Sequence, residues 1–291
     1  MMSLIDKPEI AVLCGPTASG KSELAMAWAE RLNGEIVSVD SVQIYRSMDI
    51  GTAKPSFAMR QAIPHHLIDI VEPRDRFDAA DFAIYAQDAI SDIVARQKMP
   101  ILCGGAGLYF KALFEGFFES PKPDLTVRAK WMQRASKEGA EAVYHWLVEH
   151  DPESAAQIHP NNVKRVVRAI EVFEATGQKM SLLKVTGKKQ DRFIVRDSLF
   201  LNPPREELYS RIDRRTEKMF QDGLVEEVDR LLKQYPENSP AFQAIGYKES
   251  IELIHGKRTL EEAMTQVKRN TRHYAKRQIT WFKNQKILGM V

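Results

Sequence analysis

The sequence predicts an α/β protein with a parallel sheet core and an inserted domain made only of helices. Short apolar runs alternate with helical patterns over residues 1–120, as in chains that build strand–helix–strand units. Only helical patterns occur from about residue 125 to 186, and a strand-like run returns at 193–201. Strands joined by helices favour a parallel sheet, because each crossover helix packs back onto the sheet.

The expected strands are short, rich in Val, Ile and Leu, and bounded by glycine or polar residues. They lie at 9–14, 35–39, 66–71, 100–103 and 193–201. The expected helices repeat apolar residues every three or four positions and lie at 22–32, 78–97, 107–115, 162–175 and 205–218. A last helix is expected from Thr259 to about Phe282, since Thr259 and Glu262 form a capping box.

Two polar breaks set the expected domain boundaries. Prolines and charges interrupt the pattern near residues 116–124, and a second polar stretch covers 187–192. We therefore expect a catalytic core formed by residues 1–120 and 191–291, interrupted by a helical insertion domain at 121–190. Asp151-Pro152 predicts a helix start inside this insertion, and Gly177 predicts the end of the 162–175 helix.

Composition excludes several classes of protein. The 291 residues are 44% hydrophobic and 28% charged, which are ordinary globular values. No apolar run approaches the ~18 residues of a membrane span, and MMSLIDKPEI lacks a signal core, so we expect no membrane association and a cytoplasmic protein. The sequence does not determine the oligomeric state, and a monomer is the working expectation.

Charge and cysteine content narrow the choice further. A net charge of +3 excludes binding of polyanions by bulk charge alone but leaves room for a local basic face. Cys14 and Cys103 are the only cysteines. Two cysteines form at most one disulfide, which is too few to stabilise a domain of this size, and they lack zinc-ligand spacing. We therefore expect two small buried apolar side chains.

The strongest motif is a glycine-rich loop directly after the first expected strand. It fits G-x-x-x-x-G-K-[ST] with Gly15, Pro16, Thr17, Ala18, Ser19, Gly20, Lys21 and Ser22. Such a loop turns its backbone N–H groups toward an anion, and the following helix adds the positive end of its dipole. Lys21 supplies a cation to phosphate oxygens, and the Ser22 hydroxyl can ligate Mg²⁺. The motif predicts a P-loop NTPase-like core that binds a diphosphate or triphosphate.

Asp40 is the second candidate, because it closes the expected strand at 35–39. The carboxyl ends of parallel strands face the ligand crevice, so its carboxylate should lie within reach of whatever the loop holds. Three roles remain open for it: contact with Mg²⁺ through water, general base, or helix cap.

A series of further segments occurs in one order along the chain. They are GPTASGKS (15–22), SVDSVQIYRSMDIGTAKP (38–55), HHLIDI (65–70), AADF (79–82), GGAGLYFKAL (104–113), IHPNNVKRVVRAIEV (158–172), GYKE (246–249) and TRHYAKRQITWF (271–282). Together they resemble the bacterial tRNA dimethylallyltransferases, the tRNA isopentenyltransferase family, over nearly the whole chain.

The resemblance implies a prenyl transfer. Members of this family move a dimethylallyl group from dimethylallyl diphosphate to N6 of adenosine 37 in tRNAs that read codons beginning with U. The resemblance implies that the loop holds the leaving diphosphate with Mg²⁺ and that Asp40 accepts the amine proton. It also implies Lys21 and Arg215 as catalytic contacts to the diphosphate, with Arg211 as a weaker choice.

The resemblance further implies which residues contact tRNA. They are Asp40, Ser41, Val42, Gln43, Ala106, Arg128, Lys164, Arg165, Val166, Val167 and Arg168. By themselves, the basic residues at 164–168 would fit a solvated helix face equally well. The family usually has threonine at the position of Ala106, so a hydroxyl thought to position the reacting groups is missing here. Lys268, Arg272 and Lys276 form a second basic stripe beside Tyr274, whereas Trp281 and Phe282 are expected in the core.

Three other functions compete with this interpretation. A small-molecule kinase shares the loop but does not explain the helical insertion with KRVVR. An adenylate isopentenyltransferase shares the loop and the acid but acts on free nucleotide. A non-catalytic RNA-binding protein would not need Lys21, Ser22 and Asp40 together. No guanine-reading N-K-x-D segment occurs, which disfavours a switch GTPase.

Overall fold

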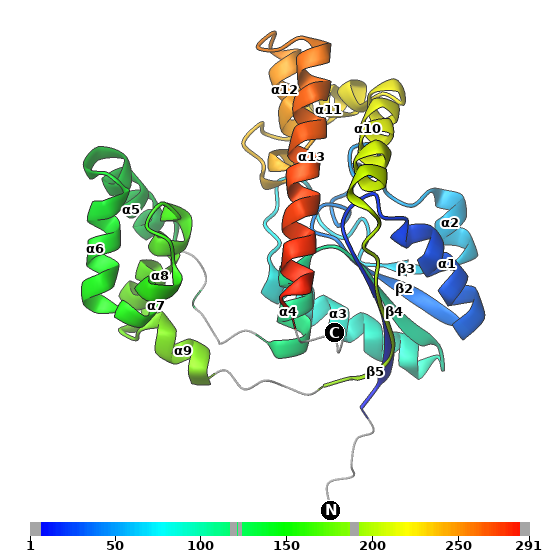
Figure 1. Cartoon of the computed structure of the whole chain (residues 1–291), viewed down its shortest axis with the longest axis horizontal. Coiled ribbons are helices and arrows are strands. Elements are labelled where there is room, and N and C mark those ends of the chain that lie inside the picture. The colour runs from blue at the N-terminus through cyan, green and yellow to red at the C-terminus, as the bar shows by residue number, and fades with distance from the viewer. Residues whose placement is uncertain (1–6, 117–120, 122–123, 187–191, 286–291) are drawn as a thin grey trace, which may run out of the picture. The chain divides into compact units, whose positions relative to one another are not determined.

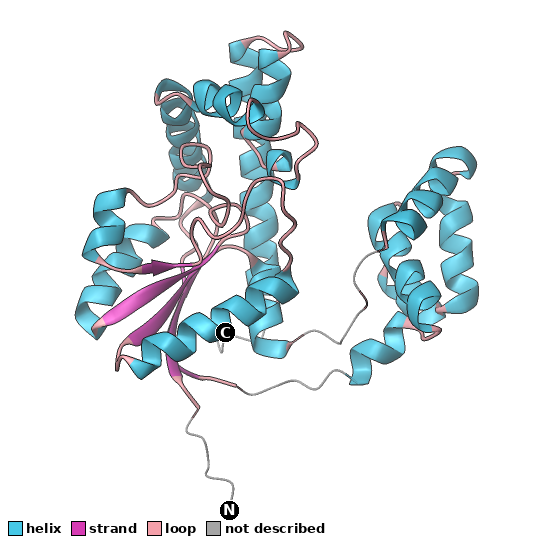
Figure 2. Cartoon of the chain, turned by 180° about the vertical axis from the view of Figure 1, so that it is seen from behind, coloured by secondary structure: helices cyan, strands magenta, loops and turns pink. Residues whose placement is uncertain are grey.

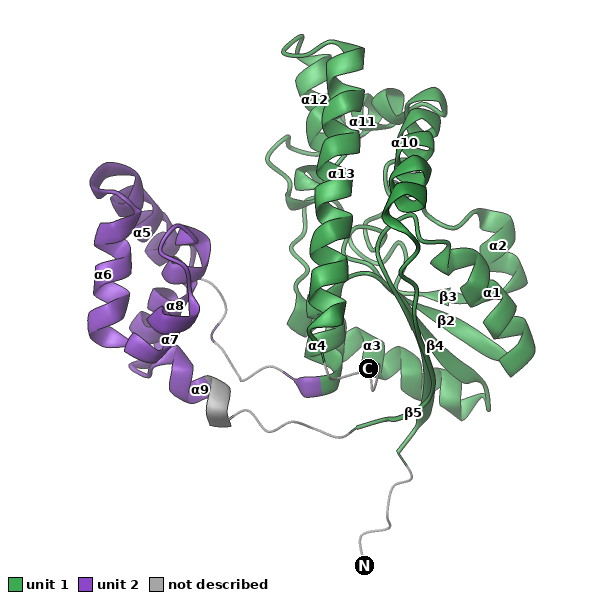
Figure 3. Ribbon diagram, in the orientation of Figure 1, with its two compact units in different colours: residues 1–114, 191–291 green, residues 115–190 purple. Residues whose placement is uncertain are grey.

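A parallel five-stranded sheet organises the larger of two compact units (Figure 1). The computed structural model describes residues 7–116, 121, 124–186 and 192–285. One unit comprises residues 1–114 and 191–291, and the other comprises residues 115–190 (Figure 3). The larger unit contains all five strands described, in the order β3-β2-β4-β1-β5, and each neighbouring pair is parallel. The mixed α/β architecture and parallel sheet agree with the prediction from sequence.

The elements of the larger unit follow the expected alternation. They are β1 (Glu9–Cys14), α1 (Lys21–Leu32), β2 (Gly34–Val39), α2 (Phe57–Ala62), β3 (His65–His66), α3 (Ala79–Ala95), β4 (Met99–Gly104), α4 (Gly107–Glu115), β5 (Ile194–Phe200), α10 (Arg205–Gln221), α11 (Leu224–Leu232), the 3₁₀ helix η1 (Pro240–Gln243), α12 (Tyr247–Ile254) and α13 (Leu260–Lys283). The capping box of α13 forms as predicted, since Thr259 Oγ1 accepts from the Glu262 N–H and Glu262 accepts from the Thr259 N–H.

Side chains of successive strand residues pack on opposite faces of the sheet. In β1, Ile10 and Val12 belong to a core covered by α3 and α4, whereas Ala11 and Leu13 belong to a core covered by α1. Figure 2 shows helices on both sides of the strands. Burial on both faces explains why the strands read as continuous apolar runs.

The strand expected at 66–71 is the main error in the secondary-structure prediction. Only His65 and His66 pair with β2. Leu67 and Asp69 adopt positive φ angles of 62° and 57°, which are incompatible with a strand. The segment continues as an irregular loop, and Val71 makes an isolated bridge with Tyr45.

The smaller unit contains only helices among its described residues. They are α5 (Leu125–Glu138), α6 (Ala140–His150), α7 (Pro152–Gln157), α8 (Val163–Thr176) and α9 (Met180–Thr186). Its core includes Trp131, Leu147 and Ile170. Asp151 caps α7 through the Ser154 N–H at 3.1 Å, and Gly177 ends α8 in the left-handed conformation, as predicted. Across the residues that the structure describes, no helix combines the length and apolar character needed to cross a membrane.

Candidate active site

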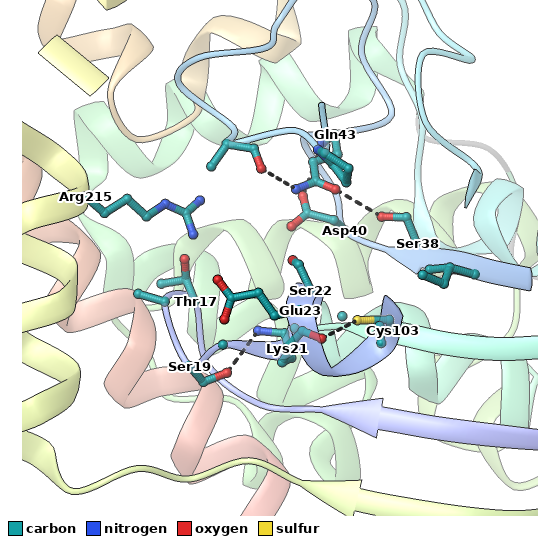
Figure 4. Close-up of a pocket in the computed structure, with 18 of the residues that line it drawn as sticks. Thr17, Ser19, Lys21, Ser22, Glu23, Ser38, Asp40, Gln43, Cys103 and Arg215 are labelled. Carbon is teal, nitrogen blue, oxygen red and sulfur yellow. Dashed lines mark hydrogen bonds between the residues drawn. The ribbon is translucent and has the colours of Figure 1, made fainter. Parts of the chain in front are cut away.

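The glycine-rich loop links β1 to α1 at the carboxyl edge of the sheet. Gly15 approaches the β5–α10 connection so closely that a Cβ atom there would lie 2.5 Å from the Leu201 carbonyl oxygen. Gly20 adopts φ 89° as the cap of α1, a conformation that L side chains rarely adopt. The Lys21 Nζ donates to the Pro16 carbonyl at 2.5 Å and lies 3.4 Å from Ser19 Oγ (Figure 4). The loop therefore holds the Lys21 ammonium against its own oxygen atoms, one from the backbone of Pro16 and one from the side chain of Ser19.

The charge state of Lys21 reflects this enclosure. Burial lowers the pKa of Lys21 to about 8, and the Arg215 guanidinium adds to the decrease. Asp40 acts in the opposite direction. An anion bound at the loop would supply the negative charge that two neighbouring cations require.

Asp40 follows β2 and forms a local cap at the entrance to the next loop. Its Oδ1 accepts from the Val42 N–H at 2.8 Å and the Gln43 N–H at 3.2 Å. Within the described part of the chain, Oδ2 has no hydrogen-bond partner, and the carboxylate lines the cleft. The cap role and a site role therefore do not exclude one another, because they use different oxygens.

Arg215 and Arg211 reach the same cleft from α10. The Arg215 Nη2 donates to the Thr52 carbonyl at 3.3 Å, and Figure 4 shows its guanidinium above Thr17 and pointing toward Asp40. Burial lowers the pKa of Arg215, and Asp40 counteracts this shift. Arg211 Nη1 donates to the Ser19 carbonyl at 3.3 Å and also pairs with Glu207 on its own helix. The Arg215 guanidinium thus faces the cleft, whereas Arg211 binds the backbone of the glycine-rich loop.

Gln278 of α13 also lines this part of the molecule, although no motif in the sequence points to it. Its Oε1 accepts from the Thr17 N–H at 2.8 Å, and its Nε2 donates to the Gly105 carbonyl at 3.0 Å. Gln278 therefore joins the loop after β1 to the loop after β4. One turn earlier, burial raises the pKa of Tyr274, with Asp40 as the next contribution. No local sequence pattern could identify Gln278, because both of its hydrogen-bond partners lie far away in the sequence.

Two hollows meet at Asp40. The larger is about 500 Å³ and is lined by the loop from Thr17 to Ser22 together with Gln43 and Gly105. The second is about 290 Å³. It is lined by Ser41, Val42 and Ile245 from loops and by residues of the helices α10 and α13. Four residues line both hollows: Thr17, Asp40, Arg215 and Tyr274. The arrangement can hold an anion on one side of Asp40 and a second molecule on the other.

The side chains that line the larger hollow suit a metal ion that is bound mainly by the oxygens of a diphosphate. Among the described residues no group of three His, Cys, Asp or Glu side chains could chelate a metal ion. Ser22 and Asp40 both line the larger hollow and offer a hydroxyl and a carboxylate. Mg²⁺ binds through few protein oxygens plus phosphate and water, so these residues fit it when a diphosphate is present.

The two cysteines differ from one another. Cys14 is fully buried, as expected, and burial raises its pKa to about 12. Cys103 is only half-buried and lines the larger hollow, which corrects the expectation of a buried apolar side chain. Its pKa is raised to about 11 by burial, so the thiol is neutral at physiological pH.

The candidate tRNA contacts of the smaller unit fall into three groups. Lys164 and Arg165 are exposed at the first turn of α8. Arg128 and Arg168 both pair with the buried carboxylate of Glu171. The remaining two, Val166 and Val167, are buried in the helical core, with exposures of 0% and 1%, so their side chains are not available at the surface.

The remaining candidates lie in the larger unit. Ala106 follows Gly105 before α4, and its N–H donates to the Val39 carbonyl at 3.1 Å. Lys268 and Arg272 pair with Glu217 and Asp213 of α10, which makes most of the C-terminal basic stripe a helix–helix contact. Phe282 is buried in the core and Trp281 packs against it, as expected.

Comparison with known proteins gives a consistent result. The sequence matches the IPP transferase family over residues 43–285 and the isopentenyl transferase family over residues 8–69. It is 45% identical over 278 residues to tRNA dimethylallyltransferase 2 of Geotalea uraniireducens, which covers 95% of this chain and 90% of that protein.

Two solved structures are also similar. The tRNA isopentenylpyrophosphate transferase of Bacillus halodurans superimposes with a TM-score of 0.69 at 40% identity, covering 96% of this chain and 88% of that one. A eukaryotic dimethylallyltransferase acting on tRNA gives a TM-score of 0.79 at 31% identity over 94% of this chain and 70% of that one. The chain therefore belongs to the tRNA dimethylallyltransferase family of prenyltransferases.

Proposed function

We propose that this protein transfers a dimethylallyl group from dimethylallyl diphosphate to N6 of adenosine 37 in tRNAs that read codons beginning with U, releasing diphosphate. The observation that carries the proposal is the position of Asp40, which borders both the hollow with the glycine-rich loop and the adjoining hollow. A site for group transfer needs this arrangement, because donor and acceptor must meet at one reactive group.

The donor is assigned to the larger hollow. The loop Gly15–Ser22 between a parallel strand and a helix supports a P-loop NTPase-like core in which backbone N–H groups cradle the diphosphate. Lys21 and Arg215 neutralise the charge that develops on the leaving group. Ser22, with Asp40 through water, would hold Mg²⁺, which when bound adds further positive charge at the diphosphate oxygens.

Asp40 acts on the acceptor. The bond between C1 of the dimethylallyl group and the diphosphate oxygen breaks, and its electron pair leaves with the diphosphate. The N6 nitrogen of adenine forms a bond to C1, and its proton passes to Asp40 Oδ2. A nearby carboxylate helps because the N6 lone pair is delocalised into the ring and the amine is a poor nucleophile.

The adenine is assigned to the second hollow, lined by Ser41 and Val42, with Gln43 beside it in the first. The base must leave its stack to enter, as in other enzymes that act on bases. We further propose that the helical insertion at 121–190 grips the anticodon arm through phosphates. The exposed Lys164 and Arg165 at the first turn of α8 support this role. Action on tRNA also favours a cytoplasmic location.

The test is mass spectrometry of nucleosides from unmodified tRNA carrying adenosine at positions 36 and 37. The tRNA is incubated with the protein, Mg²⁺ and dimethylallyl diphosphate, and AMP is offered in a parallel tube. We expect one dimethylallyl mass on the tRNA adenosine and none on AMP. Prenylated AMP alone would assign the protein to the adenylate isopentenyltransferases, and no product in either tube would contradict prenyl transfer.

A further inference from the structure

A buried carboxylate outside the proposed site collects four hydrogen bonds. Glu227 lies in α11 and is 1% exposed. Its Oε2 accepts from the N–H groups of Asp49 at 3.0 Å and Ile50 at 2.8 Å. Its Oε1 accepts from the Gly51 N–H at 3.3 Å and from the Tyr247 hydroxyl at 2.6 Å. A buried charge needs several donors, and here three of them belong to one turn of backbone.

The turn held by Glu227 leads directly into Thr52, whose carbonyl oxygen binds two side chains of the larger hollow. The Thr52 carbonyl accepts from Arg215 Nη2 at 3.3 Å and from Gln43 Nε2 at 3.2 Å. Thr52 is itself fixed, because its hydroxyl donates to the Met48 carbonyl at 2.7 Å. One backbone oxygen thus holds both the guanidinium assigned to the diphosphate and an amide beside Asp40.

Tyr247 of the GYKE segment supports the same turn in two ways. Its hydroxyl donates to Glu227, and burial raises its pKa, so it stays protonated as a donor. Its ring lies against Gly51, where a Cβ atom would come within 2.5 Å of Tyr247 Cε2. The Tyr247 ring therefore leaves no room for a side chain at position 51.

We propose that Glu227, supported by Tyr247, is a positioning residue for the transfer reaction. It fixes the turn at 49–51 so that the Thr52 carbonyl holds Arg215 toward the diphosphate and keeps Gln43 at the wall of the same hollow, close to Asp40. This inference rests on the proposed function, because it concerns the same cleft. Glu227 itself lines neither of the two hollows.

Glu227→Gln is the informative substitution. An amide keeps the size of the side chain, but one oxygen becomes an NH₂ group that faces donors instead of accepting from them. Glu249→Gln is the matched control. Glu249 is a buried glutamate of α12, 3% exposed, that bonds the Gly246 N–H and Asn270 and makes no hydrogen bond to residues 49–52.

The experiment measures binding of inorganic pyrophosphate by calorimetry, steady-state prenylation of tRNA, and thermal unfolding of each variant. We expect Glu227→Gln to weaken pyrophosphate binding about tenfold and to raise the KM for dimethylallyl diphosphate similarly. Glu249→Gln is expected to lower the melting temperature comparably while changing pyrophosphate binding less than about twofold.

A double-mutant cycle separates positioning from general destabilisation. In an Arg215→Ala background, Glu227→Gln should change pyrophosphate binding less than about twofold, because the group it positions is gone. Equal losses with and without Arg215, or equal effects of Glu227→Gln and Glu249→Gln on binding, would overturn the inference. If Glu227→Gln does not fold, Tyr247→Phe replaces it, with about a threefold weaker affinity expected and an unchanged affinity overturning the inference.

The wild-type protein is assayed first. Absence of prenylated tRNA with the wild type would overturn both the proposed function and the positioning role. Normal wild-type activity with an unaffected Glu227→Gln variant would overturn only the positioning role.

Discussion

The guanidinium of Arg128 forms a two-point contact with the carboxylate of Glu171, with Nε 2.6 Å from Oε1 and Nη2 2.9 Å from Oε2. Glu171 is 2% exposed and also accepts from Arg168, whose Nη2 donates to the Pro121 carbonyl at 2.7 Å. Two of the arginines assigned to tRNA by resemblance are therefore engaged within the helical unit. Among the candidate tRNA contacts of this unit, Lys164 and Arg165 are the more exposed cations.

The first prediction separates these two pairs. Arg128→Ala should lower the unfolding free energy by about 1–2 kcal/mol, because the buried Glu171 carboxylate loses one of its two cations. The loss is no larger because the arginine is itself partly exposed to solvent. Lys164→Ala should leave stability unchanged within ~0.5 kcal/mol and reduce the salt dependence of tRNA binding by about one unit of slope. Denaturant unfolding and a salt series of binding curves check both. An Arg128→Ala variant as stable as the parent would contradict the structural role.

The second prediction uses the two oxygens of Asp40. Asp40→Asn keeps an acceptor for the Val42 and Gln43 N–H groups but cannot take a proton, so single-turnover prenylation should fall by about 10²–10⁴ with little loss of stability. Asp40→Ala should also lose about 1 kcal/mol as the cap disappears. Asp78→Asn, at the cap of α3, is the matched control and should leave the rate unchanged. A fast Asp40→Asn enzyme would remove Asp40 as the base.

The third prediction concerns pH. The pKa of Lys21 is about 8 in the folded protein against 10.5 for the ordinary side chain. Between these values the unfolded chain binds more protons, so the contribution of Lys21 to the unfolding free energy rises with pH across that window. A bound diphosphate favours the protonated amine, so pyrophosphate binding should take up a proton above pH ~8 and weaken by up to about tenfold per pH unit.

Calorimetry in buffers of different ionisation enthalpy measures this proton uptake. Lys21→Arg supplies the control, because an arginine stays charged while the ionisation of pyrophosphate is common to both proteins. Identical pH profiles for the two proteins would show that Lys21 does not titrate in this range.

The fourth prediction tests the departure at residue 106. Ala106→Thr should give at least the parental rate of prenylation, because it restores a hydroxyl next to Gly105 at the carboxyl edge of β4. Steady-state kinetics and thermal unfolding check the result. A correctly folded variant with strongly reduced activity would contradict the view that this position has simply lost a hydroxyl.

Local chemistry explains what could be predicted from sequence. The glycine-rich loop, the strand before it and Asp40 at the end of β2 are all encoded within short segments, and the structure brings them to one sheet edge. The capping box at Thr259 and the stop at Gly177 are equally local. The strand expected at 66–71 was wrong because an apolar run does not reveal the positive φ angles of Leu67 and Asp69.

Long-range partners explain what could not be predicted. Glu171 looks like one more helix charge in the sequence, yet it determines where Arg128 and Arg168 point. Gln278 and Glu227 are each one of many polar residues in an amphipathic helix. Each is distinguished by hydrogen bonds to backbone groups more than 170 residues away. No periodicity encodes such pairings, because hydrogen bonds between distant segments form only once the chain is packed.

The place of β5 in the sheet has a consequence for synthesis of the chain. β1 pairs with β4 on one side and with β5 on the other, and the helical unit separates β4 from β5 in the sequence. A ribosome adding about 5–20 residues per second needs on the order of 10 s to proceed from β1 to β5. Until then one edge of β1 lacks its partner, so the nascent chain presents an open edge that chaperones can bind. The helical unit emerges complete in this interval and can fold first.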